Sequence, residues 1–267
     1  MIGIVGYGYV GKAVEYGFSK TKHIICDPVV NDITISNVVD VNPEAIFVCV
    51  PTPTDNTNYS NIKNVLTQIA ELQYTGIVVV KSTILFNHLD GFDVVVNPEF
   101  LSRGSSNHDF VNPPFVLFGG DKTNTSKLQD IYLKYSTVCL NNTIHTDITT
   151  ASLAKYCFNS FYATKITFLN QIYDVCEAVG VSYDSLKDIL KLNPWMGTYH
   201  FDVPGHEGRG FGGPCLPKDT EALQRAYNLD LLSTVLKLND RYTDNNTISN
   251  FSAEHGDDLS GCGHDHI

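Results

Sequence analysis

The sequence predicts an α/β fold in two parts, a doubly wound sheet followed by an all-helical domain with one long helix. Three observations carry this prediction. Short apolar runs alternate with helical stretches as far as about residue 140, and most of them end in polar or proline-containing loops. A glycine-rich turn directly follows the first run, and residues 148–178 contain neither glycine nor proline. Continuous Val/Ile runs are typical of a sheet that helices cover on both faces.

The expected elements follow from these patterns. Strands are expected at residues 2–5, 23–26, 45–50, 77–80, 94–96 and 113–120, with a further short run at 137–140. Helices are expected at residues 12–19, 62–72, 126–135, 148–178, 182–192, 218–228 and 230–240. We therefore expect a sheet domain over residues 1–146, a helical domain over 147–240 and a polar, disordered tail over 241–267. A helix as long as 148–178 suggests a central spine or a homodimer contact.

Composition limits the function classes to which this chain can belong. Hydrophobic residues make up 43% and charged residues 18%, as in globular proteins. The net charge of -11 and the lack of a Lys/Arg run argue against nucleic acid or an anionic membrane as partner. No segment approaches the roughly 18 apolar residues of a membrane-spanning helix. The chain enters a strand at Ile2, so we expect no signal peptide.

The cysteines indicate reduced thiols. There are 7 of them, an odd number, and none forms a C-x-x-C pair, so we expect a cytoplasmic protein. Near the end of the chain Cys262, His264 and His266, with His255 upstream, could bind zinc or nickel. They lack a strict ligand spacing, so a frayed, solvated tail is the favoured interpretation and no metal site is predicted.

The first strand is followed at once by the pattern G-x-G-x-x-G, which runs from Gly6 to Gly11. A helix, a second strand and Asp27, about 20 positions on, complete the setting that this pattern requires. Gly6 permits the tight turn, Gly8 lets the backbone approach a pyrophosphate, and Gly11 lets helix and strand pack closely. Asp27 can accept hydrogen bonds from the ribose hydroxyls and would repel a 2′-phosphate. The sequence therefore predicts a Rossmann-type site for NAD rather than NADP.

Three loops follow the later strands, at residues 51–54, 81–83 and 97–101. Ligands of doubly wound sheets bind beyond the carboxyl ends of the strands, so we expect these loops to face one crevice. For Pro51 and Pro53 a simpler interpretation stays open, namely that they only end a strand.

Residues 208–219 form the most distinctive stretch of the chain. Four glycines in residues 208–213 precede Cys215, Pro217 and Lys218 at the start of an expected helix. A thiol near a helix N-terminus and a lysine is where a nucleophilic thiolate would be stabilised. The alternative is a glycine-rich loop with an incidental buried cysteine. In the long helix Lys155 and Asn159 share a face, although such a lysine is usually a solvated charge.

Together these motifs resemble the UDP-glucose/GDP-mannose dehydrogenase family over roughly residues 1–240. The matching segments are Gly6–Gly11, Cys49–Pro53, Lys81–Thr83, Asn97–Leu101, Ala151–Asn159 and Gly210–Asp219. The resemblance implies an NAD-dependent, four-electron oxidation of a nucleotide-sugar C6 alcohol to a carboxylate. UDP-glucose is the substrate that we expect, because it is the most frequent one in the family.

The resemblance also implies the roles of individual residues. Cys215 would form the thiohemiacetal and thioester, Lys155 would hold the oxyanion-like oxygen, and Asn159 would be a neutral donor beside it. Asp219 would act as base or hold the catalytic water, and Thr83 and Glu99 would assist hydrolysis. The expected substrate pocket is Glu99, Phe100, Leu101, Lys155, Asn159, Tyr199, Phe211 and Gly212. The expected cofactor site is Gly6, Gly8, Tyr9, Val10, Gly11, Asp27, Pro51, Thr52, Ser82, Thr83 and Lys218.

Two departures from the family pattern bear on activity. Family members carry a third domain that closes over the nucleotide, and we expect it to be absent here because the sequence ends soon after residue 240. Ser152 stands where an acidic residue is expected. The chain would then be a minimal active enzyme, a partner of a separately encoded domain, or a natural truncation.

Two other functions remain open at this point. One is a two-electron hydroxyacid dehydrogenase of the 6-phosphogluconate type, which works with a lysine and needs no cysteine. The other is a protein that binds NAD or a nucleotide sugar without turnover.

Overall fold

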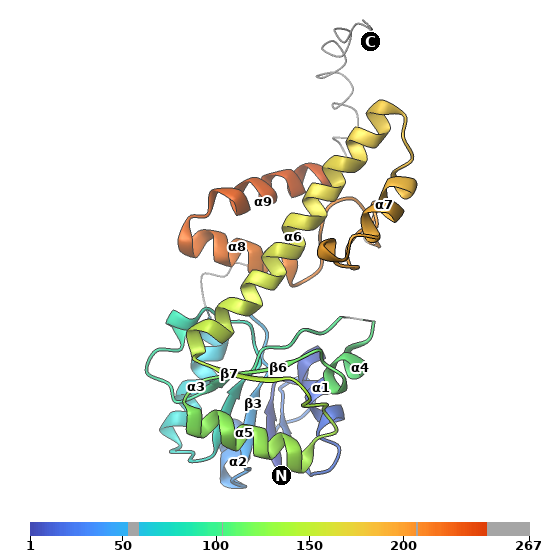
Figure 1. Cartoon of the computed structure of the whole chain (residues 1–267). Helices are drawn as coiled ribbons and strands as arrows, with labels where there is room; N and C mark the ends of the chain where they lie inside the picture. The colour runs from blue at the N-terminus through green and yellow to red at the C-terminus, as the bar shows by residue number, and fades with distance from the viewer. Residues whose placement is uncertain (53–58, 103, 207, 245–267) are drawn as a thin grey trace, which may run out of the picture. The chain divides into compact units, whose positions relative to one another are not determined.

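The computed structural model describes residues 1–52, 59–102, 104–206 and 208–244, and Figure 1 shows its course. The chain divides into two compact units, Met1–Cys157 and Phe158–Ile267. The division falls inside the helix α6 (Ile148–Val179), whereas the domain limit predicted from sequence at residue 146 precedes this helix. Residues 241–243 of the expected tail are the last turn of helix α9 (Asp230–Thr243). Residues 245–267 of that tail, with its cysteine and histidines, lie outside the described residues.

The first unit is built on a 7-stranded sheet with the strand order β2-β1-β3-β4-β5-β6-β7. Its strands are β1 (Ile2–Val5), β2 (His23–Cys26), β3 (Ala45–Val48), β4 (Ile77–Val80), β5 (Val95–Val96), β6 (Val116–Gly119) and β7 (Thr143–Thr146). All neighbours pair in parallel except β5 and β6, which are antiparallel through Val96 and Gly119. The chain runs from β1 outward to β2 and then returns to β3 on the other side of β1. A doubly wound sheet binds its ligand at this switch point, beyond the carboxyl ends of β1 and β3.

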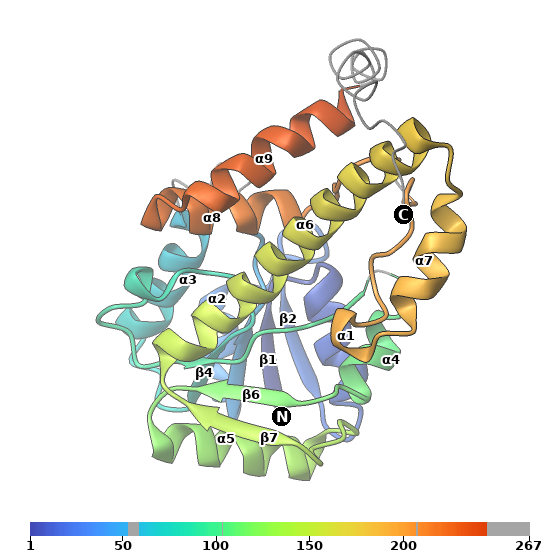
Figure 2. The same cartoon turned by 45° about the horizontal axis from the view of Figure 1, so that its top comes forward.

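Helices cover both faces of this sheet (Figure 2). Helices α2 (Ile35–Asp40) and α3 (Ser60–Glu71) pack on one face, with Val38, Ile62 and Leu66 in the core. Helices α1 (Tyr9–Gly17), α4 (Ser106–Val111) and α5 (Lys122–Tyr135) pack on the other face. The strands β1, β3 and β4 are buried along their whole length, as their continuous apolar sequences require. The predicted fold class is confirmed.

Two local predictions were wrong. The run 137–140 is not a strand, because its backbone bonds to the ends of two helices: Thr137 N–H donates to Gly17 O at 2.8 Å and Cys139 N–H to Val111 O at 2.8 Å. The seventh strand is instead β7, which is only four residues long, is partly exposed and lacks a continuous apolar run. The short helices α2 and α4 were not expected either, although Thr34 and Asn37 form a capping box at the start of α2.

The second unit contains the C-terminal part of α6 with helices α7 (Tyr183–Lys191), α8 (Leu216–Tyr227) and α9, and the short 3₁₀ helix η2 (Pro194–Met196). Leu169, Tyr183 and Phe201 form the core between α6, α7 and the following loop. A second core forms around Ala163, Phe211 and Val235. The predicted long helix is confirmed. Within the part of the chain that the structure describes, no helix has both the length and the apolar character needed to cross a membrane.

Candidate active site

The glycine turn after β1 has the geometry of a dinucleotide site. Gly6 has a φ of 91°, and a side chain there would lie 2.8 Å from the Cys49 backbone. A Cβ at Gly11 would lie 2.1 Å from Gly6 O, so both glycines are required by the fold itself. A Cβ at Gly8, by contrast, would meet nothing within 4 Å. The open side of Gly8, at the N-terminus of α1, is therefore the place where a pyrophosphate fits.

Asp27 lies at the end of β2, and the turn holds its carboxylate. Tyr7 N–H donates to its Oδ2 at 2.6 Å, and Val29 N–H donates to Oδ1 at 2.9 Å. Each oxygen keeps a second lone pair, so the group can still accept from a ribose hydroxyl. Its negative charge would oppose a 2′-phosphate, so these residues fit NAD. Tyr9 and Val10 begin α1 in the same turn, and the Tyr9 hydroxyl donates to Ser102 O.

The ends of β3 and β4 are tied together by Ser82. Its hydroxyl donates to Val50 O at 2.6 Å, directly before Pro51 and Thr52. Thr83 follows it and is half-buried. The structure thus brings the loops after β3 and β4 to one edge of the sheet, as expected. Pro53 and Thr54 lie outside the described residues.

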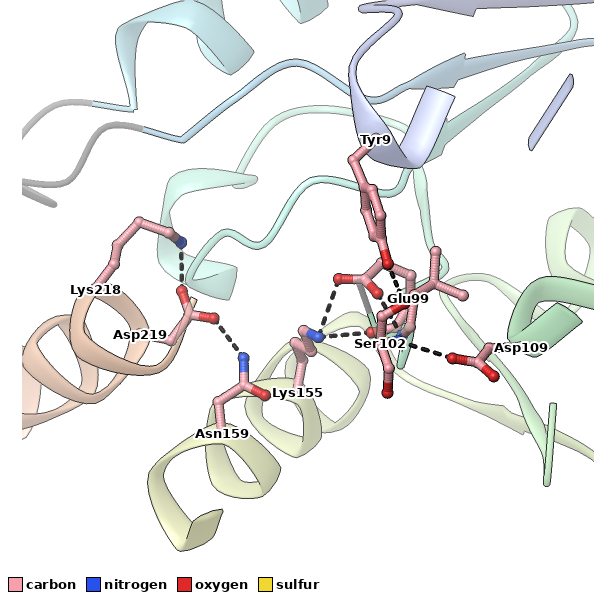
Figure 3. A network of polar contacts seen from close by, with 9 residues as sticks. Tyr9, Glu99, Ser102, Asp109, Lys155, Asn159, Lys218 and Asp219 are labelled. Atoms are coloured by element: carbon pink, nitrogen blue, oxygen red, sulfur yellow. Dashed lines mark hydrogen bonds and ion pairs between the residues drawn. The ribbon is translucent and has the colours of Figure 1, made fainter. Parts of the chain in front are cut away.

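Glu99 and Lys155 form an ion pair inside the first unit (Figure 3). Lys155 Nζ donates to Glu99 Oε1 at 3.1 Å and to Glu99 O at 2.7 Å, and the two side chains are only 11% and 7% exposed. Burial alone would raise the pKa of Glu99. The Lys155 ammonium and the hydrogen bond from Leu101 N–H outweigh burial, so the pKa of Glu99 lies below its usual value. Glu99 is therefore a carboxylate at neutral pH.

The neighbouring apolar side chains shape this charged site. Lys155 Nζ lies 5.4 Å from the centroid of the Phe100 ring, and Phe100 packs on Phe115. Leu101 is fixed by its backbone, whose N–H donates to Glu99 Oε2 at 2.7 Å. The segment that carries Glu99 is thus held both at its charged side chain and along its backbone.

A buried lysine behind this segment was missed by sequence reasoning. Lys81 is 4% exposed, and its ammonium donates to Asn97 Oδ1 at 3.0 Å. Tyr132 OH donates to the same oxygen at 2.6 Å, and Asn97 Nδ2 donates to Leu117 O at 2.9 Å. Burial lowers the pKa of Lys81 to about 8. Lys81, Asn97 and Tyr132 line a cavity of about 30 Å³ together with Glu99. The signal for Lys81 in the sequence was its place directly after an all-apolar strand.

Cys215 caps the N-terminus of α8 in the second unit. Its side chain is exposed, and Asp219 N–H donates to its carbonyl oxygen at 2.9 Å, which closes the first helical turn. The positive end of a helix dipole favours an anion at this position. Cys215 is therefore not the buried cysteine that the alternative interpretation expected.

Asp219, Asn159 and Lys218 form a buried polar cluster one turn further along the helix. Asn159 Nδ2 donates to Asp219 Oδ2 at 2.6 Å, and Lys218 Nζ pairs with Asp219 Oδ1 (Figure 3). Their exposures are 1% for Asp219, 7% for Asn159 and 9% for Lys218. The cluster fixes the carboxylate of Asp219 one helical turn after Cys215.

The remaining expected pocket residues are more scattered. Phe211 is 3% exposed and packs in the core, and Gly212 is half-buried next to it. Tyr199 is 75% exposed, and Lys165 Nζ donates to its carbonyl oxygen at 2.6 Å. Ser152 is buried, and its hydroxyl donates to Ile84 O at 2.5 Å. The hydrogen bond compensates for the burial of this polar side chain. Among the described residues, no group of three His, Cys, Asp or Glu side chains could hold a metal ion.

A glycine turn that fits NAD, on a doubly wound sheet, is typical of NAD-dependent dehydrogenases. Two models of one family match this chain. The UDP-glucose/GDP-mannose dehydrogenase family matches with its NAD binding domain over residues 32–136 and with its central domain over residues 149–241. The chain belongs to this family, and NAD is its cofactor.

Relatives of known structure or curated name agree with this assignment. UDP-glucose 6-dehydrogenase of Rickettsia bellii is 33% identical over 200 residues, which cover 68% of this chain and 44% of that protein. The structure of a UDP-glucose dehydrogenase from Pyrobaculum islandicum matches with a TM-score of 0.77 and 25% identity, over 90% of this chain and 67% of its own. The chain spans about half the length of the first curated relatives that it matches.

A third similarity concerns the fold alone. A 3-hydroxyisobutyrate dehydrogenase from Mycobacterium tuberculosis matches with a TM-score of 0.69 and 16% identity, over 96% of this chain and 94% of its own.

Proposed function

We propose that this chain oxidises the C6 alcohol of a nucleotide sugar to the carboxylate, and that UDP-glucose is the sugar. The observation that carries the proposal is the exposed Cys215 thiol at a helix N-terminus, one turn before the buried Asp219–Asn159–Lys218 cluster. A dehydrogenase that stops at an aldehyde or ketone needs no such nucleophile. The name of the Rickettsia bellii relative supports UDP-glucose as the substrate.

Two molecules of NAD, bound one after the other at the Gly6–Gly11 turn, would supply the acceptors for the two hydrides that this oxidation releases. The chain supplies the remaining chemistry. The Cys215 thiolate adds to the carbon of the aldehyde, which forms a carbon–sulfur bond and leaves an alkoxide to be protonated as the thiohemiacetal. Loss of the second hydride, together with the hydroxyl proton, leaves a thioester. Water then adds to its carbonyl carbon, the carbon–sulfur bond breaks, and the carboxylate and the thiolate are released.

The charged residues have distinct roles in this proposal. Lys155 is a fixed cation for the oxygen that becomes negative, because Glu99 holds its ammonium in place. Asn159 donates one amide hydrogen to Asp219, and we assign the other to the same oxygen of the sugar. Asp219 orients the attacking water or accepts its proton. Thr83 and Glu99 assist at this step.

The cofactor and substrate contacts follow the same assignment. Lys218, Pro51, Thr52 and Ser82 would contact NAD, in addition to the turn itself. Phe100, Leu101, Tyr199, Phe211 and Gly212 would contact the nucleotide sugar. We propose that the reaction takes place in the cytoplasm.

The experiment is uronate formation from UDP-glucose and NAD, followed by mass spectrometry. Cys215→Ser should form no acid, whereas Cys157→Ser, which removes another exposed thiol, should form as much as the wild type. Acid formation by Cys215→Ser would show that the acid does not pass through a Cys215 thioester. One NADH per sugar and no acid from the wild type would favour a two-electron dehydrogenase, a class that includes a protein with the same fold as this chain. Bound NAD without any product from a panel of nucleotide sugars would favour a binding protein.

We also propose a homodimer formed through α6. Phe161, Phe168 and Val175 lie seven residues apart on this helix and are 62%, 49% and 47% exposed. Spacing by seven places them on one face, and such a row of large exposed apolar side chains indicates a covered surface. The double variant Phe161→Ser/Phe168→Ser should sediment as a monomer. Leu231→Ser, at an equally exposed leucine of α9, should leave the sedimentation coefficient unchanged.

A further inference from the structure

The loop that precedes Cys215, residues 208–214, is rich in glycine, so contacts with other parts of the chain are needed to fix its backbone. Gly208, Gly210 and Gly213 have φ values of 104°, 77° and 72°, all in the left-handed region. Glycine is the residue that adopts these values readily, and it also has the largest conformational freedom to lose. A thiol at the end of such a loop is held in one place only if other side chains fix the loop.

Arg209 makes the largest number of these contacts. Its guanidinium carbon lies 4.7 Å from the ring centroid of Tyr173 on α6 and 4.7 Å from that of Tyr242 on α9. Its Nε donates to Asn170 Oδ1 at 2.7 Å. One terminal nitrogen donates to Asn170 O at 2.9 Å and to Asp174 Oδ1 at 2.5 Å. The side chain thus joins the loop to two helices of the second unit.

The residues after Arg209 are held by two buried asparagines. Asn170 Oδ1 also accepts from Gly210 N–H at 3.1 Å. Asn239 bonds both backbone groups of Phe211, accepting from its N–H at 2.6 Å and donating to its carbonyl at 2.9 Å. A Cβ at Gly210 would lie 2.7 Å from Asn239 Oδ1, so the loop lies against α9 with no room for a side chain.

The partners of Arg209 are themselves connected. Tyr242 OH donates to Asp174 Oδ2 at 2.8 Å. The Asp174 carboxylate therefore binds both the Arg209 guanidinium and the tyrosine whose ring lies against it. The ion pair is largely shielded, with exposures of 17% for Arg209 and 16% for Asp174. A lysine could not replace this arrangement, because an ammonium lacks the planar fork that bonds two acceptors while it lies against aromatic rings.

We propose that Arg209 is a positioning residue for Cys215. By fixing residues 209–211 onto α6 and α9, it sets where the loop delivers the thiol at the start of α8. The inference rests on the proposed function, in which Cys215 is the nucleophile. It goes beyond that function because Arg209, which takes no part in the reaction itself, determines the position of the nucleophile.

The test measures Cys215 directly and requires no turnover. The full chain and the variants Arg209→Ala and Arg209→Lys are treated with iodoacetamide, and alkylation of each cysteine is followed by peptide mass spectrometry. Cys176, which is buried in the second unit, becomes accessible when that unit unfolds, so its alkylation in the same sample reports unfolding, and urea titration checks stability. We expect the Cys215 rate to change several-fold in both variants while Cys176 stays protected. Millimolar guanidinium should return the Arg209→Ala rate toward that of the wild type, and equal sodium chloride should not.

Arg225→Ala is the matched control. Arg225 pairs with Glu221 on α8, the helix that follows Cys215, and its side chain is 54% exposed. The side chains that hold Arg209 lie instead on α6 and α9. Its removal should leave the Cys215 rate unchanged. In turnover, Arg209→Ala should lower kcat by about tenfold or more, as a displaced nucleophile does, with the Kd for NAD unchanged.

Three results would overturn the inference. The first is a Cys215 rate in Arg209→Ala equal to that of the wild type. The second is a change in the Cys215 rate that is explained by unfolding of the variant and is not reversed by guanidinium. The third is an equal effect of Arg225→Ala. If the wild type forms no uronate although its Cys215 rate depends on Arg209 as expected, the proposed function fails while the positioning role stands.

Discussion

The side-chain amide of Asn159 on α6 and the carboxylate of Asp219 on α8 are joined by a buried hydrogen bond of 2.6 Å. The second carboxylate oxygen of Asp219 pairs with Lys218, so both oxygens are engaged. A carboxylate bound on both sides has a fixed orientation and a balanced charge. This pair therefore makes the first turn of α8, which begins at Cys215, part of the packed core of the second unit.

Removal of the Asp219 charge should destabilise the second unit. Asp219→Asn takes away the counter-charge of Lys218, which is only 9% exposed, and breaking a buried pair on one side costs about 3 kcal/mol. The double variant Lys218→Met/Asp219→Leu removes both charges and should recover most of this loss. Urea unfolding of the three proteins measures both effects. An Asp219→Asn variant as stable as the wild type would contradict the account.

Two glycines of the NAD turn should respond differently to the same substitution. Gly8→Ala places a methyl group in open space at an ordinary φ of -77°, so stability should hold while NAD binding weakens by about tenfold or more. Gly11→Ala forces a contact of 2.1 Å with Gly6 O and should lower stability by about 1–3 kcal/mol. Calorimetric titration with NAD and urea unfolding separate the two outcomes. Unchanged NAD affinity in Gly8→Ala would place the pyrophosphate elsewhere.

Because of Lys81, the free energy of unfolding should increase as the pH rises above about 8. Its pKa is about 8 in the folded state because it is buried, against about 10.4 in the unfolded chain. Below pH 8 both states carry the proton, and the cost of burying the charge is fully present. Between about pH 8 and 10 the unfolded state binds more protons, so the free energy of unfolding rises, by an amount on the order of 3 kcal/mol.

Urea unfolding at pH 7.5 and pH 9.5 tests this expectation, with Lys81→Met as the comparison. The neighbouring Cys49 has its pKa raised to about 12 by burial, so it keeps its proton throughout this range. Glu99 and Lys155 are the other charged groups that act on Lys81. The variant should lose the rise that the wild type shows. Equal pH dependence in the two proteins would assign the effect to another group.

Most of the fold could be predicted because its signals are local. The strands β1, β3 and β4 are runs of Val, Ile and similar residues, and a strand buried on both faces has no other composition available. The strand β7 could not be found this way. It lies at the edge of the sheet, its sequence Thr-Ile-His-Thr is partly exposed, and pairing with β6 is what makes it a strand.

The site could be predicted only in part. Lys155 and Asn159 were placed on one helix from their spacing, but the partner of each comes from a distant segment. Glu99 is 56 residues from Lys155, and Asp219 is 60 residues from Asn159, so these pairs depend on how helices and loops pack. The contacts of Arg209 were missed for the same reason, since its partners lie 35 and 39 residues away.

The measurement that tests the central proposal most directly is the yield of NADH per sugar. Limiting UDP-glucose is converted with excess NAD, and the NADH formed is read by absorbance at completion. The account predicts two NADH for each UDP-glucose, because the Cys215 adduct gives up a second hydride before water releases the acid. One NADH per sugar, with no mass added to Cys215, would contradict it and identify a simple two-electron dehydrogenase.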